Sequence, residues 1–198
     1  MSDFLDKIER LKGILEGEKR RVVIVTHTNP DGDAIGSSLA WAECVRRWGH
    51  EVSVLVPNRF PAFLDWMTGI EELIVAKEQP EVAVEKIASA ELVFVMDLNK
   101  IDRLDAMSEP LLASSAPRVL IDHHLMPPDD YDLQFSYPDN CSTAFVTYRL
   151  IVALCGTEFI TREIAENLYA GIMTDTGNFA FSFLTPELMR AVAVLLER

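Results

Sequence analysis

The sequence has no apolar run of the roughly 20 residues that a membrane-spanning helix needs, so we expect no membrane span. Residues 1–20 mix charged side chains with Leu and Ile and contain no continuous apolar segment of the kind found in secretory signal peptides. Cysteine is scarce: the chain has 3, Cys44, Cys141 and Cys155, without Cys-x-x-Cys spacing. This excludes a disulfide scaffold and is typical of the reducing cytosol. We therefore predict a cytoplasmic protein.

Positive charge is also scarce. The 198 residues include 18 Lys and Arg against 31 Asp and Glu, which gives a net charge of −13. Tight binding to long duplex nucleic acid needs many cationic contacts with phosphates, so this class of partner is excluded. A small anionic substrate stays compatible with the charge if metal ions supply local positive charge. Apolar residues make up 49% and charged residues 25%, which are the proportions of a globular protein.

Short runs rich in Val and Ile alternate with segments of helical apolar spacing. Strands are predicted at residues 22–25, 52–56, 92–96, 118–121 and 132–137. Helices are predicted at residues 4–16, 34–48, 81–89, 143–155, 161–173 and 186–197. The alternation predicts an α/β fold with a mostly parallel sheet flanked by helices.

Acidic and imidazole side chains follow three of the predicted strands, at the point where each strand ends. They are His27, Asp31 and Asp33 after the first strand, Asp97 after the third, and Asp122, His123 and His124 after the fourth. Ligands of parallel sheets bind outside the carboxyl ends of the strands, so we expect these side chains at one edge. Each stretch alone also has a structural interpretation, as a turn, a helix cap and a polar turn respectively. Together they indicate a site.

Several carboxylates in one crevice would repel one another, and burying them unpaired costs free energy. A pair of divalent cations removes this conflict. Oxygen and imidazole ligands together suit Mn²⁺ better than Ca²⁺, with Mg²⁺ as the second choice, so we predict two Mn²⁺ ions as cofactors. Asp175 is a further carboxylate in a turn-like stretch after a helix, and spacing alone does not place it at the same edge.

Four segments, in order, resemble the successive motifs of the DHH phosphoesterase superfamily. They are His27 with residues 29–37 (NPDGDAIGS), Asp97, residues 122–124 (DHH) and residues 174–177 (TDTG). The first segment is most similar to the nano-RNase branch, whose members are bifunctional oligoribonucleases and 3′-phosphoadenosine 5′-phosphate (pAp) phosphatases. The resemblance spans residues 22–180. The Asp-His-His tripeptide alone would be a weak signal, whereas four ordered motifs are a strong one.

The resemblance implies a role for each matched residue. It implies one metal ion held by His27, Asp31 and Asp97, and another held by Asp33, Asp97, His123 and Asp175, with Asp97 bridging. His124 would face the substrate phosphate and, with Asp97, carry the catalysis. Asp122 would orient an imidazole from behind. Arg103 is a candidate phosphate contact, with a solvated Arg at a helix start as the alternative.

The implied reaction is hydrolysis of a phosphate ester by a water that two cations activate, with His124 or a metal-bound water protonating the leaving oxygen. The implied substrates are short oligonucleotides, degraded by an exonuclease, and pAp. The same ligands would serve an inorganic pyrophosphatase, an exopolyphosphatase or a cyclic-dinucleotide phosphodiesterase. Outside the enzymes, a non-catalytic nucleotide-binding module is the alternative.

Members of the nano-RNase branch carry a second, C-terminal domain with a glycine-rich GGGH-type motif. This chain has no Gly-Gly pair, and its last predicted helix runs to Arg198 without a cap. We therefore expect residues 1–185 to form the DHH catalytic domain and residues 186–198 to begin a linker helix, with the C-terminal domain absent. Because half of the substrate cleft would then be missing, we expect metal binding with weak or absent turnover of oligonucleotides.

Two helix starts are candidate anion sites. Gly36 and Ser37 lie at the positive end of the 34–48 helix and are predicted to approach a substrate phosphate. Residues 140–143 are a second such stretch, although an N-cap by Ser142 or Asn140 is the simpler interpretation. His50 is expected on the surface. The three tryptophans are expected in the core or in an interface, and a homodimer stays open.

Overall fold

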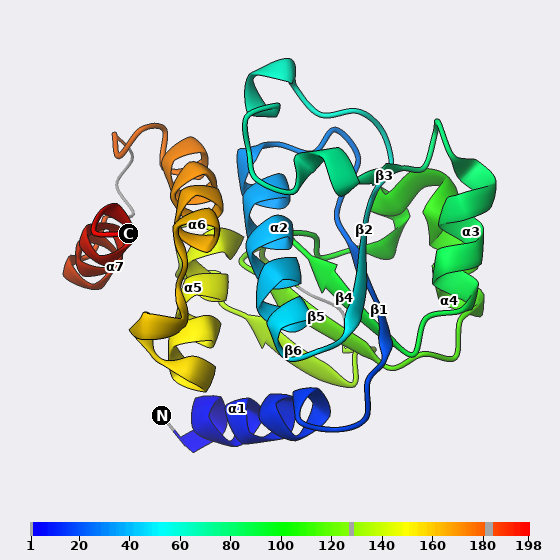
Figure 1. The fold of residues 1–198 in the computed structure, drawn as a ribbon, viewed down its shortest axis with the longest axis horizontal. Helices are drawn as coiled ribbons and strands as arrows, with labels where there is room; N and C mark the ends of the chain where they lie inside the picture. Colours follow the sequence, from blue (N-terminus) through cyan, green and yellow to red (C-terminus); the bar gives the residue numbers. More distant parts are fainter. Residues whose placement is uncertain (1, 127–128, 181–183) are drawn as a thin grey trace.

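One parallel sheet of six strands forms the centre of the protein, in the order β3-β2-β1-β4-β5-β6 (Figure 1). The computed structural model describes residues 2–126, 129–180 and 184–198. The strands are β1 (Arg21–Val25), β2 (Glu51–Val56), β3 (Ile74–Val75), β4 (Leu92–Met96), β5 (Arg118–Asp122) and β6 (Leu133–Ser136). From β1 the sheet grows in one direction through β2 and β3 and in the other through β4, β5 and β6. The switch point of the sheet therefore lies between the carboxyl ends of β1 and β4, which is where ligands bind in such sheets. The predicted α/β fold is confirmed.

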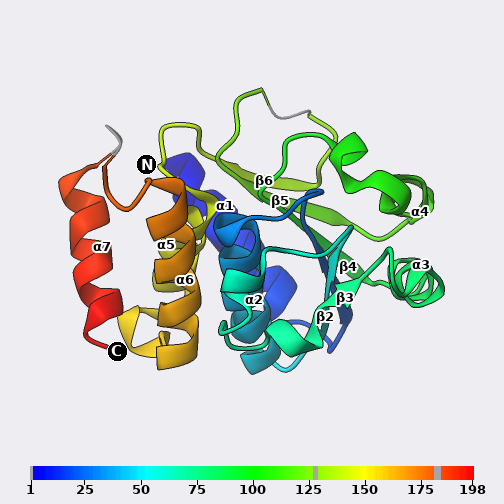
Figure 2. The ribbon, with the colours of Figure 1, turned by 90° about the horizontal axis from the view of Figure 1, so that it is seen from above.

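Helices cover both faces of the sheet (Figure 2). They are α1 (Ser2–Leu15), α2 (Gly32–Arg47), α3 (Pro80–Ala88), α4 (Ser108–Ala113), α5 (Thr143–Cys155), α6 (Arg162–Asp175) and α7 (Pro186–Leu196). Short 3₁₀ helices lie at η1 (Ala62–Leu64), η2 (Ile70–Glu72), η3 (Ile101–Met107) and η4 (Thr157–Phe159). The α1, α2, α5 and α6 helices lie on one side, with α7 outside α6, whereas α3 and α4 lie on the other side.

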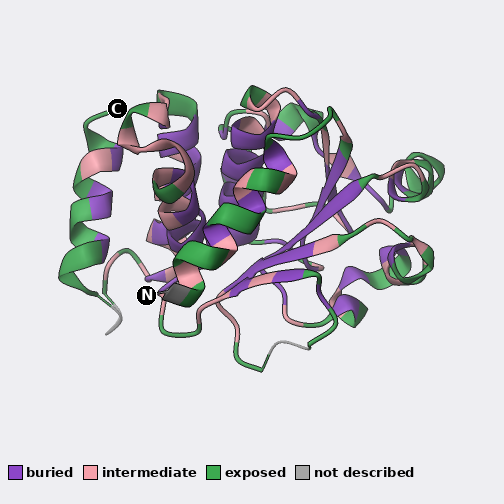
Figure 3. Cartoon of the chain, turned by 90° about the horizontal axis from the view of Figure 1, so that it is seen from below, coloured by how far each residue is buried: buried purple, intermediate pink, exposed green. Residues whose placement is uncertain are grey.

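Alternate strand residues face two separate cores. Ile24 and Phe94 face the larger core, beneath α2 and α5, and Trp41 packs edge-on against Phe94 with ring centroids 5.3 Å apart. Val23 and Val95 face the smaller core, beneath α3 and α4. Figure 3 shows the central strands buried along their length. Burial on both faces explains why these strands are continuous apolar runs in the sequence.

Side-chain caps set where the two helices nearest the site begin. The Asp31 carboxylate accepts hydrogen bonds from the backbone N–H groups of Asp33 and Ala34, both at 3.0 Å, and starts α2. The Ser142 hydroxyl accepts a hydrogen bond from the backbone N–H of Phe145 at 3.0 Å and starts α5. Such caps satisfy N–H groups that have no partner inside the helix. Of the two N-caps considered for α5, Ser142 is the one that the structure uses.

One strand and one α-helix were not predicted from the sequence, and neither were the four 3₁₀ helices of the described residues. The β3 strand has two residues, which is too short for a periodic pattern, and it pairs with β2 at the sheet edge. The α4 helix has six residues and includes Pro110, so it also gives no helical periodicity. The α6 helix extends two residues beyond the predicted 161–173, and its last residue is Asp175.

The α7 helix, expected to begin a linker, packs against α5 and α6. Leu188, Ala191, Val192 and Leu195 of this helix are buried in the larger core. The division into residues 1–185 and 186–198 stays a prediction, and residues 1 and 181–183 lie outside the described residues. Over the described ranges, no helix is both long and apolar enough to cross a bilayer.

His50 is buried, with 6% of its surface exposed, so the prediction of a surface histidine was wrong. Its Nδ1 accepts a hydrogen bond from the backbone N–H of Arg20 at 3.1 Å, and its Nε2 lies 3.0 Å from the carbonyl oxygen of Leu15. With Nδ1 acting as an acceptor, the proton of the neutral ring lies on Nε2 and is donated to Leu15. The imidazole therefore ties the connection between α1 and β1 to the start of β2.

Candidate functional site

The predicted site residues meet at the carboxyl edge of the sheet. The loops after β1, β4 and β5 deliver them to this edge, together with the first turn of α2 and the last residue of α6. Residues brought together in this way are His27, Asp31, Asp33, Asp97, Asp122, His123, His124 and Asp175. Their ligand atoms form three groups, within each of which the atoms lie no more than 4.8 Å apart: His27–Asp31–Asp97, Asp33–His123–Asp175 and Asp97–His123–His124.

His123 lies at the centre of one group of carboxylates. Its Nε2 atom is 3.3 Å from Asp175 Oδ2, 3.6 Å from Asp97 Oδ1 and 3.9 Å from Asp33 Oδ2. Its Nδ1 atom lies 3.3 Å from the carbonyl oxygen of Asn140. A proton on Nδ1, donated to that carbonyl, leaves the Nε2 lone pair facing the carboxylates, as a metal-binding imidazole requires.

His27 and Asp97 form the core of the other group. His27 Nε2 lies 3.4 Å from Asp97 Oδ2, and His27 Nδ1 lies 2.7 Å from the Thr28 carbonyl oxygen. Both side chains are buried, whereas Asp31 is exposed and reaches the group from the start of α2. Asp97 therefore presents Oδ2 to His27 and Oδ1 to His123, which places it between the two groups.

The backbone of Asp97 is left-handed, with φ of 57°. Its N–H donates to the carbonyl of Ile121 at 3.0 Å, and its Oδ1 accepts a hydrogen bond from the Thr143 hydroxyl at 2.8 Å. A non-glycine residue in this region is uncommon, although Asp tolerates it better than most residues do. Such local strain persists where surrounding contacts hold it and is enriched at functional sites.

Thr143 was not singled out by the sequence as a partner of Asp97. Its side chain is buried at the N-terminus of α5 and reaches Asp97 across 46 positions of sequence. The only sequence signal is its position directly after the predicted N-cap, which does not say where the hydroxyl points. Contacts of this kind depend on how α5 docks, so spacing alone could not have found this one.

The N-terminus of α5 binds a carboxylate of the protein itself. The backbone N–H groups of Thr143 and Ala144 donate to Asp33 Oδ2 and Oδ1, each at 2.7 Å. The positive end of a helix favours such an anion. The sequence indicated an anion site at residues 140–143, and in the structure the anion there is the Asp33 side chain.

Crowding shifts the pKa values of the buried carboxyl groups. Burial and the neighbouring charges of Asp97 and Asp175 raise the pKa of Asp33 well above its ordinary value, although the two α5 amides oppose this. Burial also raises the pKa of Asp175 to about 6, with His123 opposing and Asp97 adding to the rise. Burial alone would raise the pKa of Asp97, but the hydrogen bond from His27 and the nearby imidazoles lower it.

This donor set fits divalent cations. The carboxylates of Asp33, Asp97 and Asp175 all lie within 3.9 Å of the same His123 nitrogen. Burial and the neighbouring charge of Asp97 raise the pKa values of Asp33 and Asp175. Oxygen and imidazole donors in one cluster are the ligand types that Mn²⁺ and Mg²⁺ sites use. A bound cation would relieve the repulsion and let all three carboxyl groups ionise.

Asp122, His124 and Arg103 form a chain of contacts beside the carboxylates. His124 Nδ1 lies 2.7 Å from Asp122 Oδ1, and His124 Nε2 lies 3.4 Å from an Arg103 guanidinium nitrogen. Asp122 is fully buried, and its Oδ2 has no hydrogen-bond partner among the described residues. The hydrogen bond to Asp122 raises the pKa of His124, although burial opposes this. Arg103 is half-buried against His124 and lies near the start of η3, so its role as a phosphate contact stays a prediction.

Ser37 and Gly36 have structural contacts in place of the predicted approach to phosphate. Ser37 is fully buried, and its hydroxyl donates to the Asp33 carbonyl at 2.6 Å, which leaves no surface for a substrate. A Cβ atom on Gly36 would clash with the Asn167 carbonyl and the backbone of Gly171. The glycine therefore permits the close packing of α6 on α2, and this packing carries Asp175 to the sheet edge.

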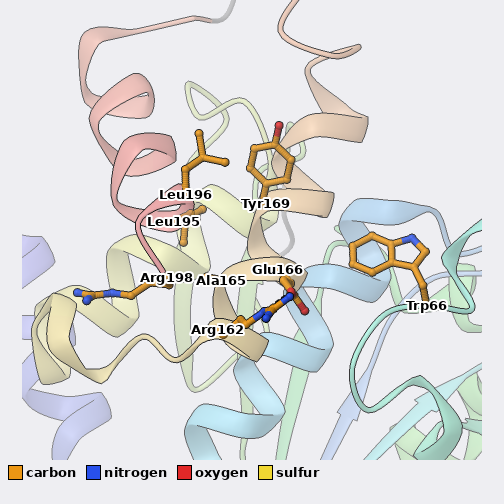
Figure 4. A pocket seen from close by; sticks show the side chains of 8 residues that line it. All are labelled: Trp66, Arg162, Ala165, Glu166, Tyr169, Leu195, Leu196 and Arg198. Carbon is orange, nitrogen blue, oxygen red and sulfur yellow. Dashed lines mark hydrogen bonds and ion pairs between the residues drawn. The ribbon is translucent and has the colours of Figure 1, made fainter.

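A separate pocket of about 320 Å³ lies between α6 and α7 (Figure 4). It is lined by Trp66, Arg162, Ala165, Glu166, Tyr169, Leu195, Leu196 and Arg198. None of the carboxylate and imidazole residues of the sheet edge lines it. Trp66, expected in the core or an interface, is 57% exposed there.

Comparison with known proteins gives matches across most of the chain. The DHH family, N-terminal domain, matches residues 21–172. The bifunctional oligoribonuclease and PAP phosphatase NrnA of Thermus thermophilus is 33% identical over 198 residues, which cover 98% of this chain and 55% of that protein. The cyclic-di-AMP phosphodiesterase PdeA of Listeria monocytogenes is 30% identical over 167 residues, covering 80% of this chain and 25% of that protein.

A solved structure also matches nearly the whole chain. The crystal structure of an exopolyphosphatase-related protein from Bacteroides fragilis aligns with a TM-score of 0.93 and 36% identity, over 97% of this chain and 56% of that one. The chain thus spans about half the length of the NrnA protein of Thermus and of this structural relative. Because the family match covers most of the sequence and its motifs converge at one edge of the sheet, the chain belongs to the DHH family.

Proposed function

We propose that this chain is the catalytic part of a metal-dependent phosphoesterase that hydrolyses short oligonucleotides and pAp. The observation that carries the proposal is the meeting of Asp33, Asp97 and Asp175 around His123 Nε2, at 3.3 to 3.9 Å. Packing alone disfavours three carboxylates in one largely buried crevice. A site for divalent cations at the switch point of the sheet accounts for them.

Each group would hold one cation. We assign His27, Asp31 and Asp97 to the first ion and Asp33, Asp97, His123 and Asp175 to the second, with Asp97 bridging because its two oxygens face different groups. Two such ions would supply positive charge for the phosphate oxygens and a bound water with a lowered pKa. Mn²⁺ is the proposed ion, with Mg²⁺ second, because imidazole and carboxylate donors are mixed.

His124 and Arg103 would contact the substrate phosphate. Both side chains are half-buried and lie together beside the acidic cluster, so a phosphate bound there could meet both. Asp122 holds the His124 ring by Nδ1, and the Nε2 atom of the ring faces the Arg103 guanidinium at 3.4 Å. The raised pKa of His124 favours a protonated ring, which can donate its proton to the leaving oxygen.

The proposed substrates rest on the Thermus relative, whose name gives both activities and whose match covers nearly all of this chain. A cyclic dinucleotide is the second candidate, since a named cyclic-di-AMP phosphodiesterase matches 80% of the chain. The acidic net charge weighs against long nucleic acid as a substrate. A cytoplasmic location and a homodimer stay predictions.

Metal binding is the first test. Chelator-treated protein titrated with Mn²⁺ in a calorimeter should bind about two ions per chain. Asp97→Ala should lose both ions and all turnover, because the bridging carboxylate is removed. Asp65→Ala, which removes an exposed carboxylate, is the matched control and should bind as the parent protein does. Absence of binding at millimolar Mn²⁺ would overturn the proposal.

A substrate panel is the second test. Rates with pAp, a dinucleotide, cyclic di-AMP, pyrophosphate and polyphosphate are compared on this same chain. Higher kcat/KM for pAp and the dinucleotide supports the proposal, and preference for cyclic di-AMP supports the second candidate. Preference for pyrophosphate or polyphosphate contradicts both. Two bound ions without turnover of any compound is the outcome expected of a non-catalytic nucleotide-binding module, and also of a catalytic domain that lacks part of its substrate cleft.

A further inference from the structure

The turn between β6 and α5 touches three of the residues assigned to the second cation. The Asn140 carbonyl oxygen lies 3.3 Å from His123 Nδ1. The Thr143 amide donates to Asp33 at 2.7 Å, and the Thr143 hydroxyl donates to Asp97 at 2.8 Å. Groups that hold metal ligands from behind in this way set the direction in which the ligand atoms point. The contacts that fix this turn therefore bear on the geometry of the cation site.

Asn140 is held at both ends of its side-chain amide. Its Oδ1 accepts a hydrogen bond from an Arg149 guanidinium nitrogen at 3.1 Å, and its Nδ2 donates to the Tyr137 carbonyl oxygen at 3.3 Å. Its backbone N–H donates to the same carbonyl at 2.9 Å. A guanidinium has donors only, so Oδ1 must be the amide atom that faces Arg149. These three contacts fix the residue whose carbonyl oxygen faces the His123 ring.

The Arg149 guanidinium is itself held from several sides. It reaches back nine positions from α5 to Asn140, and its Nε lies 3.3 Å from Glu187 Oε1 in α7. Its central carbon lies over the Phe4 ring of α1 and over the Tyr137 ring, 5.3 and 5.6 Å from their centroids. Aromatic faces attract cations at such distances. Because the guanidinium is planar and rigid, these contacts set the direction of the nitrogen that donates to Asn140.

We propose that Arg149 is a positioning residue for the second cation and that it acts through Asn140 on His123. The inference rests on the proposed function, because it concerns an ion assigned there. The guanidinium holds the Asn140 amide, and the Asn140 carbonyl orients the imidazole by its Nδ1, so that Nε2 faces the carboxylates. Without the guanidinium, the amide loses one of its two anchors and the carbonyl is free to turn away from His123.

Single-ion backgrounds make a test of this role selective. Asp31→Asn removes a ligand of the first ion and keeps a side chain that caps α2, so the second ion remains. Asp175→Asn removes a ligand of the second ion, so the first remains. Titration calorimetry with Mn²⁺ then measures one site in each background. An arginine that merely joins α1, α5 and α7 would have no preference between the two sites.

Arg149→Met keeps an apolar stem and removes every donor. In the Asp31→Asn background it should weaken Mn²⁺ binding about tenfold, whereas in the Asp175→Asn background the affinity should change by less than about twofold. Arg47→Met is the matched control. The Arg47 guanidinium also lies over an aromatic ring, 3.9 Å from the Phe159 centroid, but at the end of α2 that is remote from the site. It should leave both affinities unchanged.

A double substitution shows whether the effect passes through Asn140. Asn140→Ala keeps the backbone carbonyl but removes the amide that fixes it, so it should also weaken the second ion about tenfold. Both changes break the same contact. Arg149→Met combined with Asn140→Ala should therefore lose about tenfold in total, whereas independent effects would multiply to about 100-fold.

Circular dichroism at the titration temperature checks that each variant is folded. Arg149→Lys, which keeps a cation but lacks the rigid fork, takes the place of Arg149→Met if the latter does not fold, and it should show the same selectivity. Equal losses in the two backgrounds, no loss in the Asp31→Asn background, or a 100-fold combined loss would overturn the positioning role and leave the proposed function standing. A parent protein that binds no Mn²⁺ would refute the proposed function, and this inference with it.

Discussion

Replacement of Asp175 by Asn should stabilise the metal-free protein at pH 8 while weakening its metal binding. Asp175 is the last residue of α6, at the negative end of the helix dipole, and it lies near Asp97 and Asp31. Burial is the main feature that disfavours the ionised form of Asp175, and the neighbouring carboxylates add to it. Asn has nearly the same shape and carries no charge, so it removes the repulsion and also removes a candidate metal ligand.

The magnitude follows from the pKa of Asp175, which rises from an ordinary 3.8 to about 6 in the folded protein. The folded state binds the Asp175 proton more tightly than the unfolded state does. The contribution of this proton to the stability of the fold is therefore complete below pH 3.8 and is lost as the pH rises through 6. A rise of about two pH units, at about 1.4 kcal/mol each, gives a ceiling of about 3 kcal/mol. Screening of the carboxylate, whose side chain is 28% exposed, lowers the expected gain to about 2 kcal/mol.

Urea denaturation in excess EDTA measures this gain. The Asp175→Asn variant should exceed the parent protein in free energy of unfolding at pH 8, and the difference should shrink toward zero at pH 4. Saturating Mn²⁺ should reverse the order, because binding stabilises the parent more. A difference that is negative in EDTA, or that does not depend on pH, would refute the reasoning.

Three further substitutions test packing and positioning, each measured by urea denaturation together with Mn²⁺ titration or turnover. Gly36→Ala should cost about 1–3 kcal/mol because the new methyl group meets helix backbone, whereas Gly13→Ala, in α1 with open space around it, should gain about 0.5–1 kcal/mol. Thr143→Val should cost about 1–2 kcal/mol and weaken Mn²⁺ binding about tenfold, whereas Thr147→Val, on the same helix with no hydroxyl partner among the described residues, should do neither. Asp122→Asn should keep Mn²⁺ binding, lower turnover about 10- to 100-fold and move the alkaline limb of the pH–rate profile to lower pH, because the neighbouring imidazole loses the charge that raises its pKa.

Residues at strand ends could be placed from the sequence, because parallel strands share a carboxyl edge. Asp97 follows β4 directly and Asp122 ends β5, so counting along two apolar runs is enough to bring them together. The strands themselves were predictable for the same reason, since burial on both faces makes each a continuous apolar run.

Contacts that depend on helix docking could not be placed in this way. Asp175 reaches the site because α6 packs closely on α2 at Gly36, and only the family resemblance, not its spacing, had suggested it. The hydrogen bond from the Thr143 amide to Asp33 likewise requires the orientation of α5, which local pattern does not contain. Ser37 was assigned to substrate because the start of a helix attracts anions, but its hydroxyl turns back to the helix backbone.

The two hydrogen bonds from the α5 amides to Asp33 set the order in which the site can be assembled during folding. The amide of Thr143 reaches the carboxylate across 110 positions of chain, so the loop that encloses most of the sheet must close before this bond exists. A nascent chain that has formed only β1 and α2 therefore has Asp31 and Asp33 but not the complete cation site. Capture of a cation would then mark the completion of folding, unlike in zinc fingers, where the ion nucleates the fold.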